Sequence, residues 1–337
     1  MTGAAVLAAD GGNSKVDLLL ATADGQLLGF RRGPTISHQQ VGLDAGMRRL
    51  VELATELARE SGLGADRPVA ELGSYGLAGA DFPREIRALQ RALEATGMTR
   101  TTLLHNDTFA ALRAGTSRPW GVVLVCGHGT NGAAIGRTGR RVRFDAVGAY
   151  SGDWGGGHGI GEAAYVAAVR ATDGRGPRTS FSRSIPRQFG RRSIGPLIQD
   201  FYYGRRDMEE LGFLAPLVFE AAAEGDAVAR GIVDRLADEL VAMGRALIRR
   251  SGLAREAPEV VLAGGVFRAE DPEFYARLES GICAVAPGAS FIRLSSPPVL
   301  GAALLGIEQL GLGAGRLTAA EARLRAELAA RVGAQPA

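Results

Sequence analysis

Three short stretches combine residue types that could handle a phosphorylated ligand. The first, Asp10-Gly11-Gly12-Asn13-Ser14-Lys15, follows the apolar run 4–9. Its glycines permit positive φ and leave backbone N–H groups free to surround an anion. Asp10 is a candidate Mg²⁺ ligand that would act through water, because Mg²⁺ keeps several of its waters. The three residues after the glycines offer further donors. An ordinary hairpin with a polar tip is the alternative interpretation.

The dipeptide Asn106-Asp107 lies between a predicted strand, 101–105, and a predicted helix that extends to 114. An Asp in this position is often a helix cap. It can also act as a general base for a hydroxyl group that attacks a γ-phosphate, because phosphoryl transfer depends mainly on positioning and charge neutralisation. Asp107 could do both, and it is our candidate catalytic residue.

A second glycine-rich turn, Gly127-His128-Gly129-Thr130-Asn131-Gly132, follows the apolar run 121–126. With Asp145 downstream, it matches the G-x-G-x-x-G pattern of dinucleotide-binding proteins. That fingerprint needs a helix directly after the glycines, whereas Thr138-Gly139 is a turn signal and 141–144 alternates like a strand. We therefore interpret the segment as a second phosphate-binding hairpin.

Two more glycine-rich segments are candidate ligand contacts. Asp153, in Gly152-Asp153-Trp154-Gly155-Gly156-Gly157, could hold a sugar hydroxyl or a metal-bound water, or could be a turn residue. Five glycines between 152 and 159 are costly in entropy for a plain turn, so we expect this backbone to approach a ligand. His158 has no partner at metal-ligand spacing and is expected to be a loop histidine. Gly264-Gly265-Val266 could let adenine or ribose lie against the backbone, or could form a tight turn.

The elements that must position these residues form two similar series. Each series reads as strand, glycine-rich turn, strand, hairpin and strand, at 4–9, 16–22 and 27–30 and again at 121–126, 133–136 and 141–145. Apolar spacing and helix-start signals predict helices at 43–63, 83–95, 163–172 and about 228–247, one after Pro297-Pro298, and one from 318. Further strands are expected at 71–77, 101–105, 259–263 and 290–294.

Length and composition narrow the class of protein. A chain of 337 residues favours two domains, and 46% hydrophobic with 22% charged residues is typical of a soluble globular protein. The net charge is only +3 and no basic stripe interleaves with aromatics, which excludes nucleic acid as the expected partner. No apolar run approaches the roughly 20 residues of a membrane span, and the N-terminus lacks signal-peptide features. We therefore expect a cytoplasmic protein.

The lysine and cysteine content excludes a Walker A nucleotide-binding motif, a disulfide framework and a structural zinc site. Lys15 is the only lysine and is followed by Val16, so the chain has no Walker A motif. Cys126 and Cys283 are too few for a disulfide framework or a structural zinc site.

Taken in order, these motifs resemble the actin-like ATPase superfamily of sugar kinases, and within it the BadF/BadG-type ATPase family, which includes N-acetylglucosamine kinases. The resemblance spans most of the chain and rests on 9–15, 76–81, 106–112, Gly152-Asp153 with 173–177, and 261–267. It implies an α/β fold of two ribonuclease-H-like domains with the active site in the cleft between them. We expect one domain at 1–116, completed by C-terminal helices of about 300–337, and the other at 117–299.

The resemblance also implies an ATP-dependent carbohydrate kinase that uses Mg²⁺, forms a homodimer and phosphorylates an amino sugar such as N-acetylglucosamine or glucosamine. Asp10 matches the metal site and Asp107 the catalytic aspartate. The nucleotide-binding positions are Gly11, Gly12, Asn13, Ser14, Lys15, Gly127, Gly129, Thr130, Gly264, Gly265 and Val266. The sugar-binding positions are Ser37, His38, Asn106, Asp107, His128, Asn131 and Asp153.

Four positions near the implied sugar site depart from the family pattern. His128 replaces the usual Thr, Trp154 the usual Glu, Ala78 a common Ser, and Ser37 the Asn that precedes His in amino-sugar kinases. Two other functions therefore stay open: an ATPase that drives a protein partner, as dehydratase activators of the family do, and a non-catalytic sugar or nucleotide sensor. The activators resemble iron–sulfur proteins with cysteines from each subunit, whereas Cys126 adjoins a phosphate loop and Cys283 lies in an unrelated segment.

Overall fold

The computed structural model describes residues 3–64 and 66–333, which fall into two compact units. Unit 1 comprises Met1–Trp120 and Leu294–Ala337, and unit 2 comprises Gly121–Arg293. The chain therefore enters unit 2 once and returns to complete unit 1. The sequence-based boundaries, 116/117 and 299/300, lie a few residues from these, and the predicted ends at 1–2 and 334–337 lie outside the described residues.

Unit 1 contains a five-stranded sheet in the order β3-β2-β1-β4-β5. Its strands are β1 (Ala4–Gly11), β2 (Lys15–Ala21), β3 (Leu27–Pro34), β4 (Ala70–Leu77) and β5 (Thr99–Asn106). The first three strands form an antiparallel meander, and β4 and β5 continue the sheet parallel to β1. The carboxyl ends of β1, β4 and β5 therefore lie at one edge of the sheet.

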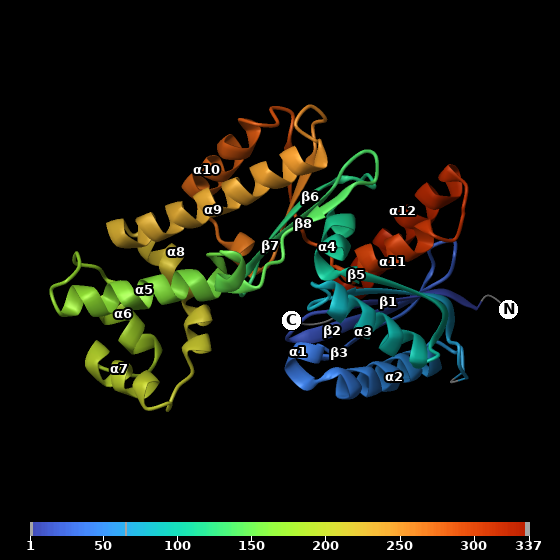
Figure 1. The fold of residues 1–337 in the computed structure, drawn as a ribbon, viewed down its shortest axis with the longest axis horizontal. Coiled ribbons are helices and arrows are strands. Elements are labelled where there is room, and N and C mark those ends of the chain that lie inside the picture. The colour runs from blue at the N-terminus through green and yellow to red at the C-terminus, as the bar shows by residue number, and fades with distance from the viewer. Residues whose placement is uncertain (1–2, 65, 334–337) are drawn as a thin grey trace. The chain divides into compact units, whose positions relative to one another are not determined.

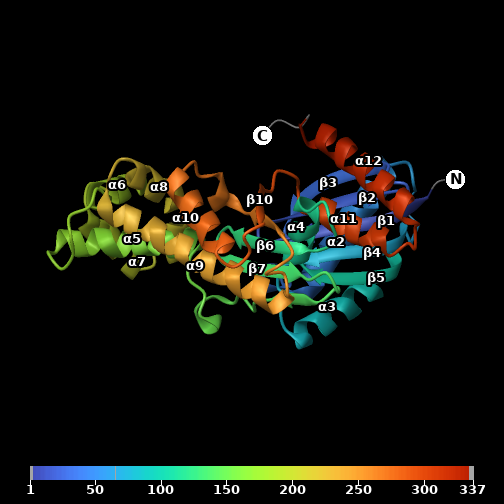
Figure 2. The same ribbon diagram turned by 90° about the horizontal axis from the view of Figure 1, so that it is seen from above.

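Helices cover both faces of this sheet (Figures 1 and 2). α2 (Leu43–Glu60), which follows the short α1 (His38–Val41), and α3 (Pro83–Ala95) pack on one face. α4 (Asp107–Gly115), α11 (Val299–Glu308) and α12 (Ala314–Gly333) cover the other. Leu18 joins the first core and Leu19 the second, which explains why residues 18–21 of β2 are all apolar rather than alternating.

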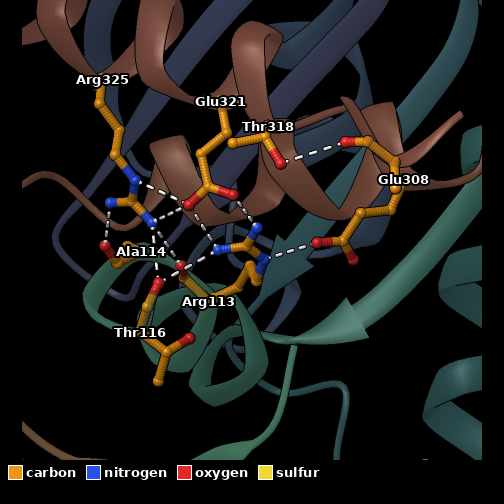
Figure 3. Close-up of polar contacts among 8 residues, drawn as sticks. Arg113, Ala114, Thr116, Glu308, Thr318, Glu321 and Arg325 are labelled. Carbon is orange, nitrogen blue, oxygen red and sulfur yellow. Dashed lines mark hydrogen bonds and ion pairs between the residues drawn. The ribbon is translucent and has the colours of Figure 1, made fainter. Parts of the chain in front are cut away.

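An ion-pair cluster ties α4 to the two C-terminal helices (Figure 3). Arg113 of α4 is almost completely buried, and its Nε donates to Glu308 Oε1 of α11 at 2.6 Å while its Nη1 donates to Glu321 Oε1 of α12 at 3.0 Å. Arg325 of α12 donates to the carbonyl oxygens of Ala114 and Thr116 at 2.6 and 3.0 Å. The cluster satisfies carbonyl groups at the C-terminal end of α4 and holds that helix in place.

Unit 2 repeats the strand arrangement of unit 1. Its sheet has the order β10-β9-β6-β7-β8, built from β6 (Gly121–Cys126), β7 (Thr130–Ile135), β8 (Arg141–Arg143), β9 (Glu259–Ala263) and β10 (Ser290–Arg293). Again three strands form an antiparallel meander and two more continue parallel to the first. The internal repeat predicted from the sequence is therefore present in the fold.

Most helices of unit 2 come between β8 and β9 in the sequence, and α5 to α8 lie away from the sheet (Figure 1). They are η1 (Gly148–Ser151), α5 (Gly156–Thr172), α6 (Phe181–Gln188), α7 (Ile194–Tyr202), η2 (Met208–Leu214), α8 (Ala215–Ala223) and α9 (Ala227–Ser251), with η3 (Gly265–Arg268) and α10 (Pro272–Cys283) after β9. α9 lies along the sheet, and α10 packs beside it. None of the helices in residues 3–64 and 66–333 has the length and apolar character needed to cross a bilayer.

Candidate active site

Three strand ends in unit 1 bring the predicted catalytic and metal-binding residues to one edge of the sheet. Asp10 is opposite Gly76 in the β1–β4 pairing, and Leu77 is opposite Asn106 in the β4–β5 pairing. Asp10 and Asp107, nearly a hundred residues apart in sequence, are therefore close enough to interact electrostatically. Ligands of open α/β sheets bind beyond the carboxyl ends of strands, which is where these two carboxyl groups lie.

Asp10 is the most strongly perturbed carboxyl group at this edge. Poor hydration of its carboxyl group, together with the negative charges of Asp107 and Asp17, raises its pKa to about 8. The positive charges of Lys15 and Arg32 act in the opposite direction and lower the pKa. Asp10 is thus a carboxyl group that lacks a sufficient positive partner.

Asp17 is a residue of this site that the sequence did not single out, because it lies within an otherwise apolar strand. It is opposite Asp10 in the β1–β2 pairing and almost fully buried. Its carboxylate accepts hydrogen bonds from Arg32 at 2.7 and 3.0 Å and from Lys15 Nζ at 3.3 Å. Lys15, which we expected to be a phosphate donor, is therefore an ion-pair partner of Asp17 in this structure, with about half of its side chain exposed.

A divalent cation fits the donor set around Asp10. The group is an oxygen ligand, the type that Mg²⁺ prefers, and two further carboxyl groups add negative potential around it. A cation there would favour the ionised form of Asp10 and lower the pKa that burial raises. The residues present are therefore compatible with the Mg²⁺ site implied for Asp10.

The first glycine-rich turn is tight and braced. Gly12 N–H donates to Lys15 O at 3.0 Å, and Thr35 Oγ1 donates to Gly12 O at 2.7 Å. Gly11 and Gly12 do not use the positive φ that glycine permits. Gly11 packs closely on the next strand instead, because a Cβ there would lie 2.7 Å from Leu77 Cδ2 and would displace that side chain.

Two predicted sugar-binding residues lie beside this turn. Ser37 is buried, and its Oγ donates to Asn13 Oδ1 at 2.8 Å. His38 begins α1, and its Cε1 would be 2.5 Å from a Cβ on Gly79, in the turn after β4. Its Nδ1 is buried without a hydrogen-bond partner in the described part of the chain. Ser14 is exposed at the tip.

Asn106, rather than Asp107, caps α4. Asn106 has extended backbone angles, and its Oδ1 accepts from Thr108 N–H at 3.2 Å, while its Nδ2 donates to Asp81 Oδ1 at 2.9 Å. Asp107 is the first residue of α4, where a negative charge is favoured by the helix dipole. The helix-capping alternative thus applies to its neighbour, and the Asp107 carboxyl group is not needed as a cap.

In unit 2, the second glycine-rich turn packs on the N-terminus of α5. Gly157 N–H donates to Gly127 O at 2.8 Å, and His158 N–H donates to His128 O at 3.0 Å. A Cβ on Gly156 would lie 2.4 Å from His128 O. The glycines at the start of α5 therefore approach the backbone of this turn, which is a different reason from the ligand contact that we expected.

The other side of the same turn is open. A Cβ on Gly127 or Gly129 would meet nothing within 4 Å in the described part of the chain. Gly264, which has φ +108°, lies against the end of β6, where a Cβ would be 2.3 Å from Cys126 O and 2.9 Å from Gly127 N. Gly265 faces open space and Val266 is buried. The two predicted nucleotide loops of unit 2 are thus adjacent, with exposed backbone.

The remaining predicted contacts of unit 2 are Thr130, Asn131 and Asp153. Thr130 is buried at the start of β7, and Asn131 Oδ1 accepts from Gly132 N–H at 2.7 Å. Because β7 follows the glycines directly, the dinucleotide-binding interpretation is excluded. Asp153 follows η1 and accepts a short hydrogen bond from Ser151 Oγ. The Arg235 guanidinium lies over the Trp154 ring, with its Cζ 3.8 Å from the ring centroid.

The prediction that His158 is a loop histidine without metal-ligand partners is wrong. α5 begins at Gly156, and His158 lies in its first turn. Its potential ligand atom and those of His128 and Glu209 all lie within 4.8 Å of one another. Sequence spacing could not reveal this, because the three residues come from three different elements.

Comparisons with known proteins place the chain in a family. The sequence matches the BadF/BadG/BcrA/BcrD ATPase family over residues 9–306. It is 27% identical over 308 residues to an N-acetyl-D-glucosamine kinase of Dictyostelium discoideum, covering 88% of this chain and 96% of that protein. It is 27% identical over 262 residues to an N-acetylmuramic acid/N-acetylglucosamine kinase of Clostridium acetobutylicum, covering 77% and 85%.

A solved structure described as an N-acetylglucosamine kinase from Chromobacterium violaceum has a TM-score of 0.72 with this chain at 22% identity. The match covers 91% of this chain and 100% of that one. This likeness confirms the predicted α/β fold class, which the chain builds on two five-stranded sheets.

Proposed function

Because the chain belongs to the BadF/BadG/BcrA/BcrD ATPase family, we propose that it is a carbohydrate kinase that phosphorylates an amino sugar of the N-acetylglucosamine class with ATP. The observation that carries the proposal is the proximity of the Asp107 carboxyl group, at the start of α4, to that of Asp10 at the edge of the unit 1 sheet. The two similar curated proteins, both kinases of N-acetylglucosamine, support the substrate class.

Asp107 acts as the general base in this proposal. It accepts the proton of a sugar hydroxyl as the hydroxyl oxygen bonds to the γ-phosphorus of ATP and the bond to the β–γ bridging oxygen breaks, releasing ADP. Asn106 is held by Asp81 and by Thr108, so the peptide that carries Asp107 is fixed before any substrate binds. Fixed positioning is the main contribution that a protein makes to this reaction.

Asp10 holds Mg²⁺ through water in this proposal. Mg²⁺ supplies charge neutralisation for the phosphate oxygens. Asp17 remains paired with Arg32 and Lys15, so it contributes negative electrostatic potential and does not act as a metal ligand. The turn of residues 11–15 contacts the terminal phosphates through backbone N–H groups and through Asn13 and Ser14, which are exposed.

Unit 2 contributes the second phosphate contact and the adenosine contact. The open faces of Gly127 and Gly129 and the adjacent Gly265 offer backbone that a nucleotide can approach closely. Ser37, His38, Asn106, Asn131 and Asp153 are assigned to the sugar. Of these, His38 has an unpaired buried ring nitrogen in the described chain, which a sugar hydroxyl would satisfy. Another predicted sugar contact, His128, has its Nε2 2.8 Å from Glu209 Oε2 and is not assigned to the sugar.

The dehydratase-activator alternative finds little support in the cysteines. Cys126 is fully buried, and burial raises its thiol pKa to about 12, so the thiolate form that an iron–sulfur cluster needs is disfavoured. Cys283 lies at the end of α10.

The proposal is tested by ADP release from Mg²⁺-ATP in the presence of N-acetylglucosamine, N-acetylmuramic acid, glucosamine or glucose. We expect N-acetylated amino sugars to stimulate release, with a phosphorylated sugar as product. If no sugar stimulates release while ATP still binds, the kinase proposal fails. A partner-coupled ATPase or a sensor would then take its place.

We further propose that the protein acts in the cytoplasm, where ATP is available, and as a homodimer. Exposed aromatic side chains in unit 2 support an interface there: Tyr202 is 81%, Tyr203 64% and Phe213 77% exposed. Light scattering should give twice the 35.1 kDa chain mass, and a monomer at all concentrations would contradict this.

A further inference from the structure

Two histidines and one glutamate from three separate elements meet beside the second glycine-rich turn. His128 lies in the turn between β6 and β7, His158 in the first turn of α5, and Glu209 in η2. One potential ligand atom from each lies within 4.8 Å of the others. His128 Nε2 and Glu209 Oε2 are 2.8 Å apart, and the two imidazole rings stack with centroids 5.3 Å apart.

One ring nitrogen of this cluster lacks a partner. His158 Nδ1 is buried and has no hydrogen-bond partner in residues 3–64 and 66–333. Buried polar atoms are nearly always paired, and an ion is one of the usual reasons when the protein offers no partner. The described part of the chain therefore leaves the His158 ring with an unsatisfied hydrogen-bonding atom.

The backbone that carries the three side chains is held in place. His158 N–H donates to His128 O at 3.0 Å, and this hydrogen bond holds the first turn of α5 against the β6–β7 turn. Glu209 N–H donates to Asp207 Oδ1 at 3.0 Å, which caps η2. A Cβ on Gly161 would lie 1.9 Å from Leu211 O, so α5 and η2 are in direct backbone contact.

We propose that His128, His158 and Glu209 form a site for a divalent transition-metal ion of the Zn²⁺ class, with water in the remaining positions. Two imidazoles and one carboxylate form a donor set that suits Zn²⁺ and its first-row neighbours, whereas Mg²⁺ prefers oxygen ligands alone. The site is therefore distinct in chemistry from the carboxyl groups at Asp10. Small side-chain movements would bring the donors to metal-bonding distance, because His128 and Glu209 are both largely exposed.

A metal ion here would replace the His128–Glu209 hydrogen bond and cross-link the β6–β7 turn to α5 and η2. The same turn carries Gly127 and Gly129, so occupancy of the site restrains those glycines. The metal site does not depend on the kinase proposal, and it can be tested without nucleotide or sugar.

The test is a Co²⁺ titration of untagged, chelator-treated full-length protein, followed by visible absorption. Co²⁺ replaces Zn²⁺ in such sites and gives ligand-field bands that report nitrogen coordination. We expect one Co²⁺ per chain, displaced by Zn²⁺. His158→Gln and Glu209→Gln should each weaken binding by at least about tenfold, the loss that even an outer-shell partner causes. The exposed Glu220→Gln, also in unit 2, is the matched control and should bind like the wild type.

A second variant keeps the result decisive if a substitution disturbs folding. Glu209→His replaces the carboxylate by a third imidazole and should retain one-to-one Co²⁺ binding. The proposal is overturned if the wild type shows no ligand-field bands at one equivalent. It is equally overturned if binding is unchanged in both His158→Gln and Glu209→Gln, because the ion would then be bound elsewhere.

Discussion

Asp10 lies opposite Asp17 across β1 and β2 and near Asp107, so three carboxyl groups share one poorly hydrated part of unit 1. Arg32 and Lys15 neutralise Asp17, and Asp10 keeps a pKa of about 8. At the residue scale, this excess of carboxyl groups over positive charges favours cation binding at the edge of the sheet. It also makes the stability of the protein without metal depend on pH.

Asp10→Asn is expected to stabilise the metal-free protein increasingly as pH rises from 4 to 8. The native Asp10 binds its proton up to about pH 8, whereas an unfolded Asp ionises near its model value of 3.8, so the wild type loses stability across this interval. Asn cannot ionise, so the variant escapes the loss, by up to about 1.4 kcal/mol per pH unit. Urea unfolding at pH 4, 6 and 8 measures the difference. A constant difference at all three pH values would show that Asp10 is not perturbed.

Gly156→Ala should raise the KM for ATP and lower the melting temperature. Gly156 has φ +69°, and its Cβ would lie 2.4 Å from His128 O, so the substitution must displace the second glycine-rich turn. Gly148→Ala is the matched control, since Gly148 also has φ +69° but a Cβ there meets nothing within 4 Å in the described chain. Equal effects of the two substitutions on KM would show that backbone strain, not close approach, decides the result.

At the scale of elements, α4 carries Asp107, and contacts at its C-terminal end and middle fix its position. Its C-terminal end is held by Arg113, Glu321 and Arg325 (Figure 3). Its middle touches α11 at Gly301. The C-terminal helices therefore position a residue that lies about two hundred residues earlier in the sequence.

Gly301→Ala should reduce turnover and destabilise the protein by about 1–3 kcal/mol, the usual cost of overpacking. The new Cβ would lie 1.8 Å from Ala110 O, so α11 and α4 must separate and move Asp107. Gly231→Ala in α9 is the control, because that Cβ meets nothing within 4 Å in the described residues and alanine favours a helix. Unfolding free energies and kcat of both variants decide the matter, and a fully active, stable Gly301→Ala would contradict the packing argument.

The sequence predicted those elements whose local signals agree with their tertiary setting. α3 begins at Pro83 as expected, and β9 has the predicted bounds because its apolar run is buried throughout. The start of α5 was missed because glycine disfavours a helix, and only the close approach to His128 O explains Gly156 there. The helices between Phe181 and Ala223 and α10 were not predicted, because no signal was identified for them in the sequence.

In the candidate site, too, residues with a local signal were predicted, and residues defined by tertiary contacts were not. Asp10 and Asp107 stood out by their positions at strand ends. The roles of Asp17, Arg32 and Glu209 depend on pairing across strands or between elements, which no short motif records.

At the scale of the whole molecule, one strand arrangement occurs twice, and each copy has its own sheet. Unit 1 is completed by a return of the chain, so its core contains side chains from both ends of the sequence, such as Val6 and Leu324. Unit 2 is built from one continuous segment. The two units should therefore respond differently to loss of the C-terminus.

Removing residues 312–337 should destabilise unit 1 selectively. Buried Arg113 loses Glu321, and breaking a buried ion pair costs about 3–5 kcal/mol; the side chains of Leu324 and Leu328 are lost from the core as well. Hydrogen exchange read by mass spectrometry should show faster exchange in β1–β5, with β6–β9 protected as in the full chain. Uniform loss of protection across both units would contradict their independence.

The central claim, that Asp107 is the base of a sugar kinase, is tested most directly by Asp107→Asn. Sugar-stimulated ADP release and the dissociation constant for ATP should be measured on the wild type and the variant together. Because Asn106 caps α4, the substitution should leave the helix intact and ATP affinity close to that of the wild type. The account predicts a fall in kcat of at least about 100-fold, the lower end of what a general base contributes. Sugar-stimulated turnover at the wild-type rate in Asp107→Asn would contradict it.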